Sequence, residues 1–197
     1  MPKGVFSKYP RTRLRDFAVC GILITMKYNY AQLYQKNAEI YERRPNLKNA
    51  LLLCNVLFSW LFFVAYALLI VYAVFHDAFT AKEWIAALFF PLFCLFLVSV
   101  LRLAIERPRP YAKTGANIKP MIKKTGRENK SFPSRHVASA FVISMLFTAH
   151  FPVFGAFLLL ASGFLAYVRF SVGAHYLADL FVGAGIGVAL GLPIFFL

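Results

Sequence analysis

Five apolar runs follow one another along most of the chain after residue 48, and short connections join most of them. A helix needs about 20 mostly apolar residues to cross a membrane, where helices and closed barrels alone satisfy their backbone groups. Because 60% of the residues are hydrophobic and only 15% are charged, the chain is too apolar for a soluble domain of this length. We predict an all-α, polytopic membrane helix bundle with five core transmembrane helices. The predicted spans are Asn49–Phe75, Trp84–Leu101, Arg135–Phe151, Pro152–Phe170 and Tyr176–Leu197.

Two details of these spans bear on function. The third and fourth have apolar centres of only about 15 residues, so they reach membrane length by including flanking Arg and His residues, which must then face the bundle rather than lipid. In the last span, Gly183, Gly187 and Gly191 fall four residues apart, and such a stripe of small residues lets a neighbouring helix approach closely. We therefore expect a polar pocket inside a closely packed bundle.

The first 48 residues form a basic and aromatic region that we predict to lie at the membrane surface, and residues 49–197 form the transmembrane domain. Within the first region, Tyr28–Arg44 mixes aromatic and aliphatic residues with polar ones, a pattern typical of an amphipathic helix in the headgroup zone. A sixth, tilted span over residues 17–36 is the alternative. Four polar residues disfavour it, namely Lys27, Asn29, Gln32 and Lys36.

The net charge of +14 is concentrated on one face of the predicted bundle. With five spans, residues 1–48, the 104–134 loop and the 171–175 turn share that face, and every Lys and Arg except Lys82 lies on or near it. Nucleic acid is the usual partner of so basic a chain. Because these cations border membrane spans, we expect anionic lipid headgroups as partners and no nucleic acid. The excess of basic residues also favours the cytoplasmic side for this face.

Three clusters of polar residues lie on this same face, each where an apolar run ends or begins. In the first, Arg102 and Arg109 are seven residues apart, so on a continuous helix they project from one side and can bind a phosphate together. Pro108 and Pro110 end the helix and restrict the direction of Arg109. Arginines at the end of a span also commonly extend to lipid headgroups, and this alternative stays open for either residue alone.

The second cluster is Pro133-Ser134-Arg135-His136, at the start of the third span. Ser134 is placed to cap the helix, so that the amides of Arg135 and His136 point toward whatever lies above the helix end, and an anion suits that position. Arg135 adds a further cation. The alternative is that Ser134 only caps the helix and that His136 is an ordinary polar residue of its first turn.

The third cluster combines Arg169, at the end of the fourth span, with His175 and Asp179, which lie one helical turn apart. Gly173 allows the sharp turn before them. Asp179 can accept the Nδ1 proton of His175 and leave Nε2 free as a nucleophile. A metal is the competing use of such a pair, but the sequence offers neither further ligands at zinc-like spacing nor the carboxylates of a two-metal site. We expect no metal and no other cofactor.

Together the clusters resemble the signature of the type 2 phosphatidic acid phosphatase family. That signature has three parts: a basic residue, six positions and Arg-Pro; then Pro-Ser-Gly-His; then Ser-Arg, five positions, His, three positions and Asp. Order, spacing and position at membrane boundaries agree over about residues 84–197. Arg107-Pro108 does not fit the first part, because no basic residue lies seven positions before it. Three residues depart from the family, with Arg102 in place of Lys, Arg135 in place of Gly and Val168 in place of Ser.

The resemblance implies a metal-independent membrane phosphatase acting on lipid phosphates through a phosphohistidine. His175 would attack phosphorus and Asp179 would orient it, while His136 would protonate the leaving oxygen and later activate water. The implied phosphate-binding residues are Arg102, Arg109, Ser134, Arg135 and Arg169.

The expected substrate is an anionic phospholipid or a polyprenyl phosphate, such as polyprenyl diphosphate, phosphatidylglycerophosphate or phosphatidate. One alternative is a lipid phosphotransferase that uses the same phosphohistidine. Another is a binder or transporter of lipid phosphates, which would need none of His136, His175 and Asp179. We expect a multi-pass protein of the plasma membrane. The resemblance implies an extracytoplasmic active site, whereas the basic residues favour the cytoplasm.

Overall fold

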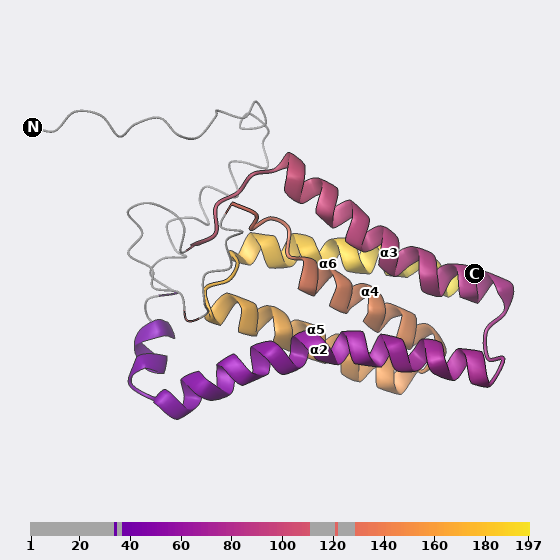
Figure 1. Ribbon diagram of the computed structural model, residues 1–197, viewed down its shortest axis with the longest axis horizontal. Helices are drawn as coiled ribbons and strands as arrows, with labels where there is room; N and C mark the ends of the chain where they lie inside the picture. Colours follow the sequence, from indigo (N-terminus) through magenta and orange to yellow (C-terminus); the bar gives the residue numbers. More distant parts are fainter. Residues whose placement is uncertain (1–33, 35–36, 111–120, 122–128) are drawn as a thin grey trace, which may run out of the picture.

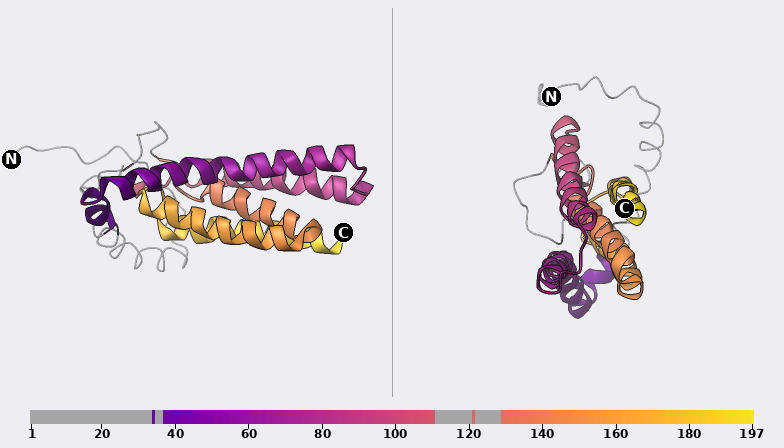
Figure 2. Two further views of the ribbon diagram at one scale, coloured as in Figure 1. Left: turned by 90° about the horizontal axis from the view of Figure 1, so that it is seen from below. Right: turned by 90° about the vertical axis from the view of Figure 1, so that its right-hand side faces the viewer.

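The computed structural model describes Tyr34, residues 37–110, Met121 and residues 129–197. In this part of the chain the long elements are all α-helices, and they run alongside one another (Figure 1; Figure 2). The predicted all-α membrane bundle is thereby confirmed. The helices are α2 (Pro45–Phe75), α3 (Ala81–Ala104), α4 (Arg135–His150), α5 (Pro152–Ser171) and α6 (Leu177–Gly191), and a short 3-10 helix, η3 (Leu192–Phe196), continues α6.

The five predicted apolar runs all form helices, but they differ in how much protein surrounds them. Four of them are long and apolar enough to cross a membrane, namely α2, α3, α5, and α6 together with η3. The fifth, α4, has only 16 residues and packs against each of the other four helices. A helix surrounded by protein needs little apolar surface toward lipid. The central position of α4 therefore explains why its sequence includes the buried residues Ser139 and Ser144.

Two turns set the arrangement of α4, α5 and α6. Phe151 alone separates α4 from α5, and Pro152 occupies the first turn of α5, where a missing N–H has no consequence. Between α5 and α6, Gly173 has a φ of +76°, a conformation that residues with a Cβ rarely adopt. A Cβ atom at Gly173 would also lie 2.7 Å from the ring of Tyr34. Gly173 thus permits the predicted sharp turn that returns the chain to the bundle just before His175.

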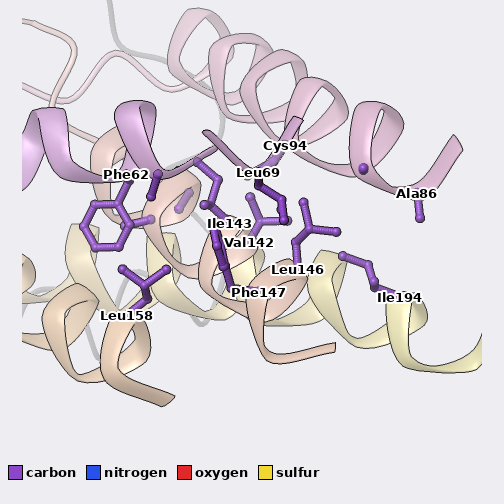
Figure 3. Packing of buried hydrophobic residues seen from close by; sticks show 14 of the residues in the cluster. Phe62, Leu69, Ala86, Cys94, Val142, Ile143, Leu146, Phe147, Leu158 and Ile194 are labelled. Carbon is purple, nitrogen blue, oxygen red and sulfur yellow. The ribbon is translucent and has the colours of Figure 1, made fainter. Parts of the chain in front are cut away.

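The apolar core follows α4 and connects it to every other helix. Its side chains pack between the helices (Figure 3). The outward sides of α2, α3 and α5 carry exposed Leu, Val and Phe residues, as lipid-facing surfaces do. The core residues labelled in Figure 3 are Phe62, Leu69, Ala86, Cys94, Val142, Ile143, Leu146, Phe147, Leu158 and Ile194.

The predicted glycine stripe forms the contact between α6 and α4. A Cβ atom at Gly187 would lie 2.5 Å from the carbonyl oxygen of Ala138, and one at Gly183 would lie 2.8 Å from the carbonyl oxygen of Ser134. Gly191 is equally crowded by a side chain of α4. The prediction of a close helix approach is confirmed. Its consequence is that the first turns of α4 and α6 lie side by side, because the stripe reaches the level of Ser134.

Residues 28–33, 35 and 36 of the predicted interfacial helix Tyr28–Arg44 lie outside the described residues, as does all of the alternative span over 17–36 except Tyr34. Residues 37–42 are helical, and α2 begins at Pro45 rather than at Asn49.

Replacing Gly187 by Ala should destabilise the bundle by about 1–3 kcal/mol, because the added methyl group collides with backbone that cannot move away. Gly185→Ala is a matched control in the same helix, since a Cβ atom there meets nothing within 4 Å. The control should be neutral or up to about 1 kcal/mol more stable through its higher helix propensity. Thermal unfolding in detergent measures both. Equal unfolding temperatures for the two variants would show that α4 and α6 do not pack in this way.

Candidate active site

The three polar clusters meet at one end of the bundle. Arg102 lies in the last turn of α3 and Arg169 in the last turn of α5, while α4 and α6 begin at this same end (Figure 1). The side chain of His136, in the first turn of α4, interacts electrostatically with Arg102, Arg169 and His175. Residues from α3, α4, α5 and the turn before α6 therefore belong to a single site.

Three arginines of this site are buried despite their charge. The exposed fractions of Arg102, Arg109 and Arg169 are 6%, 9% and 8%. Arg102 donates a hydrogen bond to a backbone carbonyl just before α4, and Nη1 of Arg109 donates to the carbonyl oxygen of Ala174 at 3.3 Å. Arg109 and Arg169 both act electrostatically on His175. Guanidiniums fixed in this way, away from solvent, strongly favour an anion in their midst.

Ser59 of α2 holds one side of Arg169. Nη2 of Arg169 donates to the hydroxyl of Ser59 at 2.7 Å, and that hydroxyl donates to the carbonyl oxygen of Asn55 at 2.5 Å. Nε of Arg169 is buried and has no hydrogen-bond partner among the described residues, so it remains available to a bound anion. No sequence pattern marks Ser59, which is one of several polar residues in an otherwise apolar helix.

Ser134 occupies the predicted N-cap position of α4, but its hydroxyl does not cap the helix. Within the described chain, Oγ is buried and without a hydrogen-bond partner. The backbone N–H of Ser134 instead donates to the carbonyl oxygen of Asp179 at 3.0 Å. The capping prediction is therefore wrong for the side chain, because Ser134 is anchored to α6 through its backbone. The unpaired hydroxyl and the first amides of α4, which lack intrahelical acceptors, are all donors suited to an anion.

His175 is held through Nδ1 with Nε2 unengaged. Its exposed fraction is 1%, and Nδ1 lies 2.8 Å from the carbonyl oxygen of Ser131 and 3.6 Å from Oδ2 of Asp179. The nearest acceptor for the Nδ1 proton is thus a backbone carbonyl, rather than Asp179 as the sequence suggested. No described residue forms a hydrogen bond with Nε2.

The surroundings of His175 also keep its ring neutral. Burial lowers the pKa of His175 below its ordinary value; Arg109 and Arg169 act in the same direction, and Asp179 opposes them. A lowered pKa means that the imidazole carries no proton on Nε2 at pH 7 and retains the lone pair that a nucleophile needs.

Asp179 is completely buried and accepts three hydrogen bonds. Its donors are the guanidinium of Arg107 at 2.5 Å, the hydroxyl of Ser131, and the backbone N–H of Tyr176 at 3.1 Å. No sequence pattern identifies Arg107 or Ser131. Arg107 falls outside the signature spacing, and only its pairing with Asp179 in space reveals it.

Arg135 and His136 are half-buried in the first turn of α4. Arg135 acts electrostatically on His136, so its charge acts on the same site. In the described part of the chain, no three His, Cys, Asp or Glu side chains gather in a manner that could hold a metal ion.

A family model places these helices in a known group of proteins. The PAP2 superfamily model matches residues 83–196, which is more than half of the chain and includes all three clusters. The chain belongs to the PAP2 superfamily. The family resemblance drawn from the three-part signature is therefore confirmed.

Two solved structures resemble this PAP2 superfamily member over most of its length. LpxE from Aquifex aeolicus is 24% identical, with a TM-score of 0.59, and the match covers 83% of this chain and 92% of LpxE. A transmembrane PAP2-type phosphatidylglycerolphosphate phosphatase from Bacillus subtilis is 18% identical, with a TM-score of 0.63. This match covers 92% of this chain and 87% of the Bacillus protein. No curated protein matches the chain significantly. The family and the shared fold support a multi-pass membrane phosphatase of lipid phosphates.

Proposed function

We propose that this protein hydrolyses phosphate esters or diphosphates of membrane lipids through a phosphohistidine at His175. The observation that carries the proposal is the state of the His175 ring: Nδ1 is bound to the carbonyl oxygen of Ser131, and Nε2 has no hydrogen-bond partner in the described chain. A buried imidazole held in one tautomer next to two buried guanidiniums is suited to attack an electrophile that carries negative charge.

In the first step, the lone pair of Nε2 attacks phosphorus while the bond from phosphorus to the lipid oxygen breaks. His136, in its protonated form, donates a proton to the leaving oxygen, so the lipid leaves as an alcohol, or as a monophosphate if the substrate is a diphosphate. The phosphorylated ring becomes positively charged, and Asp179 together with the carbonyl oxygen of Ser131 stabilises that charge through Nδ1–H.

In the second step, neutral His136 accepts a proton from water as the water oxygen attacks phosphorus, and the bond from phosphorus to Nε2 breaks. Inorganic phosphate leaves and His136 is protonated again. Throughout, Arg102, Arg109 and Arg169 offset the charge on the equatorial oxygens, and Ser134 with the first amides of α4 adds hydrogen bonds.

A lipid substrate fits the position of the site at one end of the helix bundle. The phosphate would enter at the interface, where Arg135 is half-buried, while the tails remain in the lipid layer. Polyprenyl diphosphate, phosphatidylglycerophosphate and phosphatidate all meet this description. A phosphotransferase would use the same intermediate and pass the phosphoryl group to another alcohol, whereas a binder would release no product.

His175→Ala should lower phosphate release by more than about 1,000-fold, because the substitution removes the proposed nucleophile. A non-hydrolysable lipid phosphonate should still bind with nearly unchanged affinity. His76→Ala is the matched control, since His76 is exposed at the opposite end of the bundle. The measurement is free phosphate released from a panel of lipid phosphates in detergent, with and without a chelator. Activity that survives His175→Ala, or that disappears with the chelator, would contradict the mechanism.

We also propose that the site faces away from the cytoplasm, as in the family that the signature resembles. Lys82 and Glu106 are both exposed and lie at opposite ends of the α3 region, so a cysteine at each reports one side of the membrane. In intact cells, a membrane-impermeant thiol reagent should label Glu106→Cys, and it should label Lys82→Cys only after permeabilisation. The wild type, with its three native cysteines, gives the background. The reverse labelling pattern would place the site in the cytoplasm, as the basic residues favour.

A further inference from the structure

Arg107 pairs with the acidic residue of the site rather than with the phosphate-binding pocket. Its Nη1 lies 2.5 Å from Oδ1 of Asp179, and the exposed fractions of the two side chains are 21% and 0%. The guanidinium also lies over two aromatic rings, with its central carbon 4.3 Å from the ring centre of Tyr176 and 5.9 Å from that of Phe132. These contacts hold Arg107 at Oδ1 of Asp179, whereas Nδ1 of His175 lies nearest to the other oxygen, Oδ2.

Ser131 connects Arg107, Asp179 and His175 within one short segment. Its N–H donates to the carbonyl oxygen of Arg107 at 2.9 Å, its hydroxyl donates to Oδ2 of Asp179, and its carbonyl oxygen accepts from Nδ1 of His175 at 2.8 Å. The chain after α3 and the chain before α4 are thereby held together at this point. A single buried residue therefore contacts the nucleophilic imidazole, the carboxylate beside it and the backbone of Arg107.

The buried negative charge of Asp179 requires a cationic partner, which Arg107 provides. A carboxylate removed from water is strongly destabilised unless a cation and hydrogen bonds compensate it. His175 cannot supply that cation in the resting site, because its ring is neutral. Among the arginines, Arg102, Arg135 and Arg169 act on His136, and Arg109 and Arg169 act on His175, whereas Arg107 acts on Asp179.

We propose that Arg107 and Ser131 are positioning residues for the nucleophile, with Arg107 holding the Asp179 carboxylate in place and Ser131 fixing the Nδ1 proton of His175. The inference rests on the proposed function, because it assumes that His175 attacks phosphorus. Without Arg107 the buried carboxylate loses its compensating charge and one of its three hydrogen bonds. Asp179 then no longer lies where it can stabilise the positive ring of the phosphohistidine.

A double-mutant cycle between Arg107→Gln and Asp179→Asn tests this coupling. In the wild-type background, Arg107→Gln should lower kcat by about 10- to 100-fold, the range typical of residues that orient a functional histidine, and should change KM by less than about twofold. In the Asp179→Asn background, the same substitution should change kcat by less than about twofold, since the carboxylate through which Arg107 acts is gone. Arg107→Lys should restore part of the lost kcat because it retains the charge.

Controls separate positioning from folding and from phosphate binding. Arg43→Gln makes the same chemical change at an exposed arginine and should leave kcat and KM as in the wild type. Thermal unfolding in detergent shows whether each variant is folded, and Arg107→Lys carries the cycle if Arg107→Gln does not fold. Equal losses of kcat in the two backgrounds, or a raised KM with unchanged kcat, would overturn the inference. If His175→Ala is inactive while the cycle is additive, the positioning role fails alone; if His175→Ala is active, the proposed function fails.

Discussion

The buried carboxylate of Asp179 is the interaction on which the rest of the site depends. Its oxygens accept from Arg107, Ser131 and the start of α6, and its backbone carbonyl oxygen accepts from Ser134 at the start of α4. One residue therefore fixes the relative positions of two helix ends and of the segments that precede α4 and follow α3. A carboxylate with no access to water is tolerated only where such a set of donors surrounds it.

The fold makes that arrangement by bringing small residues together. Gly183 and Gly187 let α6 approach the backbone of α4 closely, and Gly173 permits the turn that precedes His175. The site therefore depends on positions with no side chain as much as on its charged residues. α4 is surrounded by the other helices, so its first turn, with Ser134 and His136, is held by packing on several sides.

The sequence predicts the parts of this structure that repeat along the chain or lie near one another in it. Hydropathy predicts the five helices, the four-residue spacing of glycines predicts the close contact of α6, and the four-residue separation of His175 and Asp179 predicts that they lie together. Contacts between distant segments are not predicted: Arg107 is 72 residues from Asp179, Ser131 is 44 from His175, and Ser59 is 110 from Arg169. No local periodicity encodes such pairs. The same reason explains why the acceptor of the Nδ1 proton and the partner of Ser134 differ from the expected ones, since both are backbone atoms brought near by folding.

Transfer of a phosphoryl group to one ring nitrogen tests the account most directly. His136→Ala should slow hydrolysis of the intermediate, and an activated aryl phosphate needs no proton on its leaving group, so the phosphorylated enzyme should accumulate with that substrate. Rapid quenching with a phosphorus-32 label, followed by peptide mapping, locates the group. We predict an acid-labile, base-stable label on the peptide that contains His175. A label on any other residue, or stoichiometric release of the aryl alcohol with no label on the protein, would contradict a nucleophilic role for His175.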